Sequence, residues 1–334
     1  MPPDAATRHG LADGPVAELD ADHVVDLHRP RHDELGHDER LALARALGES
    51  DVWAVSLVGG EVTIVRELPE YAEILKRHGK YVSLATSGLG LARHLDRLLD
   101  AGLDSFTFSV DSHRPEAHDA FRGPNGLFES ILAAIRRIRA AGRDGAPAVQ
   151  IRCTINRLNF RELPAYMEFW DPLADNIVLQ IVQDNGIHHV RDRAVMFRPE
   201  DRPALEEILA GLRARHPRLR TKHYELMPRY VFEPEALHEE LGFRCLLVPA
   251  TSAVIMPDGN VRLCYGRDDS LVGNVRESSL AEIWRSERTR ETQRRMQSRE
   301  YGCMCWEQAC GGNLELIPLH NATERALGLL GRRS

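Results

Sequence analysis

The sequence predicts an α/β protein in which a parallel sheet covered by helices is followed by a small cysteine-rich module. From residue 23 onward, short apolar runs alternate with amphipathic segments. About six such βα units in a row imply right-handed crossovers and a parallel sheet, either open or curled into a partial barrel. The alternation stops near residue 235, and five of the six cysteines lie beyond that point.

The expected strands are short apolar runs closed by turn residues. They are residues 23–27, 52–58, 81–85, 105–110, 149–155 and 177–182. The expected helices carry apolar side chains at helical spacing. They cover residues 38–47, 66–78, 91–101, 127–138, 161–170 and 202–213. Residues 1–20 are rich in proline, glycine, aspartate and alanine without a period, so we expect a flexible N-terminal arm there.

Composition excludes several classes of protein. A chain of 334 residues, 43% hydrophobic and 28% charged, can bury a large core and is not a disordered tail. No run approaches the roughly 18 apolar residues of a membrane helix, and the first residues do not resemble a signal peptide. A net charge of −7 gives no general attraction to nucleic acid or acidic lipid. We therefore expect a cytoplasmic protein with no nucleic-acid or membrane partner.

The late cysteines form a pattern of their own. Residues 253–261 are typical of strand, tight turn and strand, with Gly259 supplying the permissive backbone angle. Such a hairpin brings Cys245 and Cys264 together. Three further thiols lie on a short segment that ends in two glycines: Cys303, Cys305 and Cys310. Thiols that cluster in a reducing compartment indicate metal or redox chemistry more than disulfides.

Spacing alone leaves the metal open. Thiolates on turns with nearby backbone amides suit an iron–sulfur cluster, because the amides donate hydrogen bonds to the sulfurs. A structural zinc ion held by four thiolates fits the same spacing. Unligated buried thiols are a third interpretation. Tyr265, next to Cys264, is expected to pack beside the metal site, with a redox or substrate-contact role as the alternative.

The cysteine module resembles the SPASM-type C-terminal domain of radical S-adenosylmethionine (SAM) enzymes. The resemblance rests on Cys245, on Gly259 followed four residues later by Cys264, and on the segments 273–275 (Gly-Asn-Val) and 279–284 (Ser-Leu-Ala-Glu-Ile-Trp). It implies an auxiliary 4Fe–4S cluster and favours iron–sulfur over zinc. We expect one cluster, held by Cys245, Cys264 and two of the three later cysteines, because Asn313 stands where fuller SPASM domains have a further cysteine.

The resemblance extends upstream over roughly residues 21–315. Gly59-Gly60-Glu61 resembles the superfamily's GGE motif, which binds the amino group of SAM, and Thr86-Ser87-Gly88 resembles its TNG turn. Thr154-Ile155-Asn156 lies where the family's fifth strand ends. The family has a partial (β/α)6 TIM-like barrel, which we assign to residues 21–235. A SPASM/twitch-like α+β domain and a tail then cover residues 236–334.

By this resemblance, SAM-binding residues lie after several strands. They are Gly59, Gly60, Glu61, Ser109, Asp111, Arg152, Asn156 and Gln183. Arg152 and Asn156 would meet the carboxylate and the ribose. Plainer interpretations stay open: an ordinary βα turn for the glycines, a helix cap for Ser109 and Asp111, and a surface position for Arg152.

The family's initiating motif, CxxxCxxC, is missing. Its three thiolates would hold a 4Fe–4S cluster in the loop near residues 27–31, but no cysteine precedes Cys153, which we expect to be a core residue. The four histidines near that loop do not reproduce the ligand spacing. Two explanations stay open. The chain is a degenerate member that lost radical initiation, or its recorded start is misplaced, since residues 28–35 resemble the segment just beyond the third cysteine of the motif.

The sequence thus predicts a radical SAM/SPASM-like iron–sulfur protein. With an initiating cluster it would act on a peptide or small metabolite by SAM-dependent radical chemistry, with an electron donor such as ferredoxin or flavodoxin. Without one, it would be a binding partner of an intact radical SAM enzyme. A zinc-stabilised scaffold is the third hypothesis.

Overall fold

The computed structural model describes residues 33–141, 146–184 and 193–302, together with Cys305, Trp306, Leu314 and the backbone of residues 16–20. Strands of this part of the chain form one sheet, in the order β6-β5-β4-β3-β2-β1-β7-β8-β9. The strands are β1 (Val16–Asp20), β2 (Ala54–Val58), β3 (Tyr81–Thr86), β4 (Ser105–Ser109), β5 (Ala148–Ile155), β6 (Asn176–Ile181), β7 (Ser252–Ile255), β8 (Asn260–Arg262) and β9 (Leu271–Asn274).

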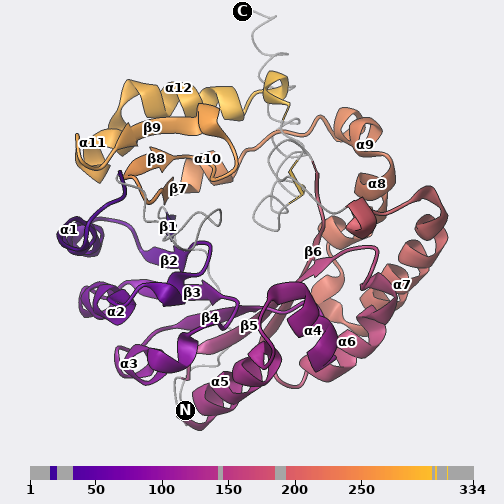
Figure 1. Cartoon of the computed structure of the whole chain (residues 1–334). Helices are drawn as coiled ribbons and strands as arrows, with labels where there is room; N and C mark the ends of the chain where they lie inside the picture. The colour runs from indigo at the N-terminus through magenta and orange to yellow at the C-terminus, as the bar shows by residue number, and fades with distance from the viewer. Residues whose placement is uncertain are drawn as a thin grey trace, which may run out of the picture.

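The first six strands are parallel and lie side by side in chain order. Helices connect them and cover the outer side of the curved sheet (Figure 1). They are α1 (His37–Glu49), α2 (Leu68–Arg77), α3 (Leu95–Asp100), α4 (Pro115–Arg122), α5 (Leu127–Ala141) and α6 (Leu163–Trp170). After β6, the chain continues through α7 (Arg202–Arg215), α8 (Lys222–Phe232) and α9 (Pro234–Leu241). The predicted partial (β/α)6 barrel is therefore confirmed.

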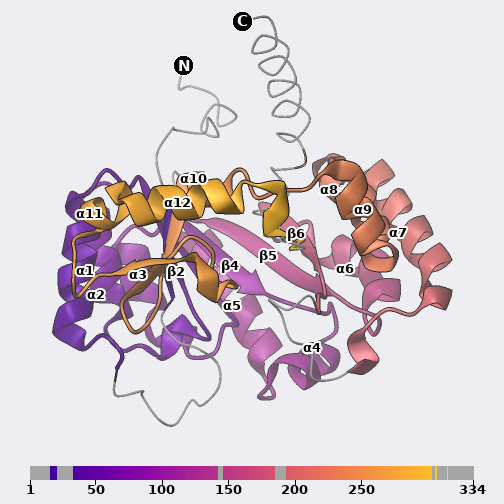
Figure 2. The same ribbon diagram turned by 90° about the horizontal axis from the view of Figure 1, so that it is seen from above.

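The C-terminal module continues this sheet. Strand β7 pairs in parallel with β1, and β8 pairs antiparallel with both β7 and β9. The described part of the module also contains the helices α10 (Val248–Thr251), α11 (Leu280–Arg285) and α12 (Glu287–Met296). Helices α11 and α12 pack on β9, and Figure 2 shows α12 lying across the module. The predicted hairpin with its turn at Gly259 is confirmed by the β7–β8 pair.

One arginine fastens the module to the barrel. The Arg276 guanidinium bonds both carboxylate oxygens of Glu39 on α1, at 2.6 and 3.1 Å. It also donates to the backbone oxygens of Asp33, Glu34 and Asp258. This pairing lowers the pKa of Glu39 to about 2, mainly through the hydrogen bonds from Arg276.

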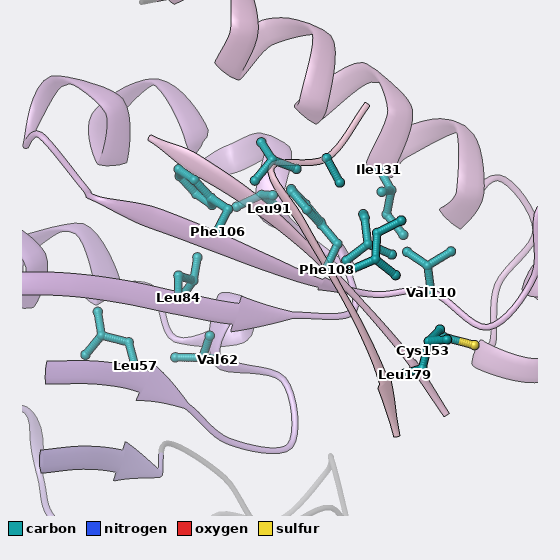
Figure 3. Packing of buried hydrophobic residues seen from close by; sticks show 14 of the residues in the cluster. Leu57, Val62, Leu84, Leu91, Phe106, Phe108, Val110, Ile131, Cys153 and Leu179 are labelled. Carbon is teal, nitrogen blue, oxygen red and sulfur yellow. The ribbon is translucent and has the colours of Figure 1, made fainter. Parts of the chain in front are cut away.

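The two faces of the sheet differ in chemistry. In β5, Val149, Ile151, Cys153 and Ile155 are buried against the helices, whereas the alternate residues keep partial exposure. Figure 3 shows Phe106 and Phe108 of β4 on this buried side, with Ile131 of α5 nearby. Successive strand side chains point to opposite faces of a sheet. The apolar core therefore lies between the sheet and the helices, and the alternate, partly exposed residues of the strands lie on the concave face.

Three features differ from the sequence-based expectations. The first strand, Val16–Asp20, lies inside the segment that was expected to be a flexible arm. The polar composition of that segment gives no strand signal, and pairing with β2 and β7 stabilises the strand. The expected strand at 23–27 lies outside the described residues. Helices α8 and α9 were not expected: Pro228 lies inside α8, where proline is unusual, and Pro234 is the first residue of α9. Among the described residues, no helix is long and apolar enough to cross a membrane.

Candidate functional site

The concave face of the barrel is largely polar. Alternation along β2 to β6 places on it the polar side chains Ser56, Ser83, Ser105, Thr107, Ser109, Gln150, Arg152, Thr154, Asn176 and Gln180. The same alternation also places there the smaller set Ala54, Val58, Tyr81, Ala85, Ala148 and Val178. The Ser83 hydroxyl bonds that of Ser56 at 2.8 Å, and the Thr107 hydroxyl bonds the Gln150 amide oxygen at 3.2 Å. Closed (β/α)8 barrels fill this position with branched apolar side chains. A polar face suits a polar ligand instead.

Glu61 joins the turns that come after β2 and β3. Its side chain is buried, and its carboxylate accepts five hydrogen bonds. Two come from the backbone N–H and hydroxyl of Thr63, at 3.1 and 2.5 Å, and one from the Thr86 hydroxyl at 2.6 Å. The backbone N–H of Ser87 donates at 2.7 Å, and its hydroxyl donates as well. The structure thus brings together the GGE-like motif and the Thr86-Ser87-Gly88 turn.

Asp111 is bonded in a similar way at the end of β4. One carboxylate oxygen accepts the backbone N–H of Thr154 at 2.8 Å, and the other pairs with the guanidinium of Arg122 on α4 at 2.5 Å. Only 5% of the Asp111 side chain is exposed. A buried carboxylate needs such partners to stay charged, so Asp111 fixes the ends of β4 and β5 relative to α4.

Ser109 and Arg152 are direct neighbours across the β4–β5 pair, on the concave face. The Nε atom of Arg152 is buried and has no hydrogen-bond partner among the described residues. Burial raises the pKa of the Tyr224 phenol on α8, and the Arg152 charge offsets part of that rise. A buried guanidinium N–H without an acceptor is costly unless a ligand supplies one. Arg152 is therefore the strongest candidate on this face for binding an anionic group.

Asn156 and Gln183, the remaining predicted residues of the barrel, bond to the chain itself. Asn156 is buried, accepts the backbone N–H of Leu158 at 2.8 Å and donates to the Thr154 carbonyl at 3.1 Å. Gln183, just after β6, accepts the Tyr230 hydroxyl at 2.9 Å and the backbone N–H of Trp306 at 2.7 Å. Both residues lie at strand ends as expected, and Gln183 faces the cysteine module.

Three of the five predicted cluster ligands lie in the described part of the chain. Cys245 and Cys305 are buried, with 3% and 5% exposure, and Cys264 is partly buried at the end of β8. Cys303 and Cys310 lie outside the described residues. Soft thiol donors of this number, shielded from water, fit an iron–sulfur cluster or zinc. Among the described residues, no three His, Cys, Asp or Glu side chains lie close enough together to hold a metal ion, so Cys245, Cys264 and Cys305 are not assembled as a ligand set there.

The turns around these cysteines are well defined. Gly259 has a φ of +84°, and a Cβ atom there would lie 2.9 Å from the side-chain oxygen of Asn274. After β8, the Ser270 hydroxyl donates to the Cys264 carbonyl at 2.9 Å and accepts its N–H at 3.2 Å. Tyr265 is 42% exposed in the protein chain itself, and its expected packing beside the metal site stays a prediction.

Cys153 is the core residue that the sequence predicts. It is fully buried on the helix side of β5 (Figure 3). Burial, with a smaller contribution from Asp111, raises the pKa of its thiol well above the usual value. A buried neutral thiol is inert toward metals and alkylating reagents, so Cys153 does not fit an initiating cluster.

Two groups that hold the site were not expected from the sequence. Thr63 donates two hydrogen bonds to the Glu61 carboxylate. The sequence signal for this contact, a polar residue two positions after an acidic one, is weak. Arg122 pairs with Asp111 from eleven residues further on, with a helix start between them. No local pattern could have revealed that pair.

Two family models match the chain. The Radical SAM superfamily model matches residues 23–169, and the SPASM model, an iron–sulfur cluster-binding domain, matches residues 245–311. The second match spans all five late cysteines, and the two together cover more than half of the chain. With the parallel barrel already described, these matches show that the chain belongs to the radical SAM superfamily and carries a SPASM domain. The resemblance inferred from the motifs is confirmed.

Two curated relatives are about one quarter identical to this chain over the aligned residues. The PqqA peptide cyclase of Rhizobium meliloti (strain 1021) is 27% identical over 257 residues, which cover 75% of this chain and 66% of that protein. A probable GTP 3′,8-cyclase of Metallosphaera sedula is 25% identical over 236 residues, covering 69% of this chain and 71% of that protein. The chain thus spans just under two thirds of the first relative.

Solved structures share the fold. A structure titled anSMEcpe with bound AdoMet superimposes with a TM-score of 0.60 at 14% identity, covering 84% of this chain and 80% of that one. Streptococcus suis SuiB bound to S-adenosylmethionine gives a TM-score of 0.60 at 12% identity, covering 82% and 66%. At such identities the likeness concerns the fold.

Proposed function

We propose that this protein binds one auxiliary 4Fe–4S cluster in its SPASM domain, SAM at the carboxyl ends of the barrel strands, and a peptide or small polar metabolite on the concave face. The observation that carries the proposal is the polar concave face with the buried Arg152 Nε, next to a module with buried thiols.

The ligands proposed for the cluster are Cys245, Cys264 and two of Cys303, Cys305 and Cys310. When bound, a 4Fe–4S cluster supplies one-electron chemistry. The chain contributes shielding from water at Cys245 and Cys305, and the backbone turn that the Ser270 hydroxyl holds at Cys264.

In the barrel, the proposed SAM-binding residues divide into two roles. Gly59, Gly60, Ser109 and Arg152 would touch the ligand, with the Arg152 guanidinium binding its carboxylate by charge-assisted hydrogen bonds. Glu61, Asp111, Asn156 and Gln183 position the strand ends, because their polar groups already bond the chain.

The proposed substrate is a peptide or a small polar metabolite. One relative is a peptide cyclase, and a neighbouring structure carries AdoMet with a bound Kp18Cys peptide. Hydroxyl and amide groups on the concave face can donate to and accept from peptide or nucleotide groups alike. A cytoplasmic location and an electron donor such as ferredoxin or flavodoxin belong to the same proposal.

A second function is favoured by a specific observation. No cysteine precedes Cys153 in the sequence, and Cys153 itself faces the core. With no initiating cluster, the protein would bind SAM or substrate and assist an intact radical SAM enzyme. A zinc-stabilised scaffold is the alternative for the C-terminal module.

Anaerobic reconstitution and an assay for SAM cleavage separate these functions. The protein is supplied with iron, sulfide, reductant and SAM, and 5′-deoxyadenosine is measured by chromatography while SAM binding is measured by calorimetry. SAM binding without 5′-deoxyadenosine supports the partner function. Formation of 5′-deoxyadenosine supports the enzyme and reveals an initiating site. Absence of SAM binding contradicts the proposed barrel site in both cases.

A further inference from the structure

An aromatic cluster joins the two cysteine segments to the end of the barrel. Trp306, directly after Cys305, is 1% exposed, and its ring is stacked between two side chains of α8. Tyr230 lies 4.7 Å away with an interplanar angle of 17°, and His223 lies 5.4 Å away at 19°. Since these two residues are seven positions apart on one helix, they face the same side. Both rings of α8 therefore stack on the Trp306 ring.

The cluster continues to the other cysteine segment. The Tyr230 ring meets His238 of α9 edge to face at 6.0 Å, and His238 meets Phe243 at 4.9 Å. Phe243 is buried and stands two residues before Cys245. We call His223, Tyr230, His238, Phe243 and Trp306 the aromatic bracket. It links cysteine segments that are sixty residues apart in the sequence.

Gln183 connects the aromatic bracket to the sheet. It lies just after β6, is 6% exposed, and its amide oxygen accepts both the Trp306 backbone N–H at 2.7 Å and the Tyr230 hydroxyl at 2.9 Å. Both donors are buried with it. If the acceptor is removed, two donors lose that partner away from water, which is costly. The Gln183 side chain therefore holds both Tyr230 and Trp306, which stack on each other.

We propose that Gln183 is a positioning residue that, through the aromatic bracket, holds Cys245 and Cys305 in place for the metal. This role rests on the proposed cluster, but the geometry exists in the protein chain itself, so it can be tested without metal. Gln183 also connects the segment of the proposed ligand Cys305 to the end of β6, beside the concave face.

The test is site-resolved alkylation of the metal-free protein. Iodoacetamide labelling of each cysteine is measured by mass spectrometry in the wild type, Gln183→Leu, Gln183→Glu and Gln293→Leu. The last variant removes a side-chain hydrogen bond within the cysteine module, from Gln293 to the Pro249 carbonyl, away from the bracket. Cys153, buried in the barrel core, reports any global unfolding in every sample.

We expect Gln183→Leu to speed labelling of Cys245 and Cys305 about tenfold, because two buried donors lose this acceptor, with Cys153 unchanged. Gln183→Glu keeps an acceptor and should stay near the wild-type rate, as should Gln293→Leu. Unchanged labelling of Cys305 in Gln183→Leu overturns the proposal. So does equal acceleration at Cys153, since that means general unfolding.

A second measurement uses the reconstituted protein. Iron loss to a chelator and the midpoint potential of the cluster are compared in the same variants, with faster loss expected only in Gln183→Leu. Wild-type protein that binds no iron would contradict the proposed function, while the alkylation result would still decide the role of Gln183. Iron loss equal in all variants, with normal loading, contradicts the positioning role.

Discussion

Replacing Glu61 by glutamine tests whether this carboxylate holds together the turns that follow β2 and β3. Five donors converge on it, two of them backbone N–H groups. Hydrogen bonds to a charged group contribute about 1.5–3 kcal/mol each and neutral ones about 0.5–1.5 kcal/mol. Hydroxyls can rotate to accept from the new amide group, but the N–H of Ser87 or Thr63 then faces another donor.

Because these contributions are not additive, we expect Glu61→Gln to lower the free energy of unfolding by about 3 kcal/mol. Urea unfolding monitored by circular dichroism measures the change. Ser87→Ala removes one hydroxyl donor and should lower it by only about 1 kcal/mol. Glu207→Gln, on the exposed side of α7, is the matched control and should change nothing. A Glu61→Gln variant as stable as this control would refute the structural role of Glu61.

Single residues give three further predictions. Arg152→Gln should weaken SAM binding about tenfold or more by calorimetry, since a charge-assisted bond is lost, while Arg136→Gln on α5 should not; equal affinities would contradict the carboxylate site. Glu39, whose pKa is held near 2 against 4.5, contributes stability that is present above about pH 4.5 and lost as the pH falls toward 2. Melting temperatures between pH 6 and 2 should therefore fall more steeply in wild type than in Arg276→Gln, and parallel curves would contradict the link. Gly259→Ala should lower the free energy of unfolding by about 1–2 kcal/mol, because its φ of +84° disfavours a side chain; no loss in a urea titration would show that the turn adapts.

The sequence could predict the barrel because its strands carry their own signal. In β5, buried and partly exposed residues alternate along the whole strand, and α5 carries a continuous apolar stripe. The first strand, Val16–Asp20, could not be predicted in the same way. Its sequence is short and half polar, and its pairing with both β2 and β7 depends on residues far away in the chain.

The candidate site was predictable where a motif is local. Gly59-Gly60-Glu61 and Thr86-Ser87-Gly88 lie together as the family pattern implies, because the turns after adjacent parallel strands meet at one edge of the sheet. The partners of Asp111 and Gln183 were not predictable. Arg122 and Trp306 reach them across the tertiary structure, and nothing in the neighbouring sequence marks such a contact.

Binding of iron and sulfide by the late cysteines can be measured by metal and acid-labile sulfide analysis of anaerobically reconstituted protein, beside Cys245→Ala, Cys264→Ala and the core control Cys153→Ala. We expect about four irons and four sulfides per chain in the wild type and Cys153→Ala, as one 4Fe–4S cluster requires, and their loss in the other two variants. Stoichiometric zinc without iron, or a cluster that survives both substitutions, would contradict it.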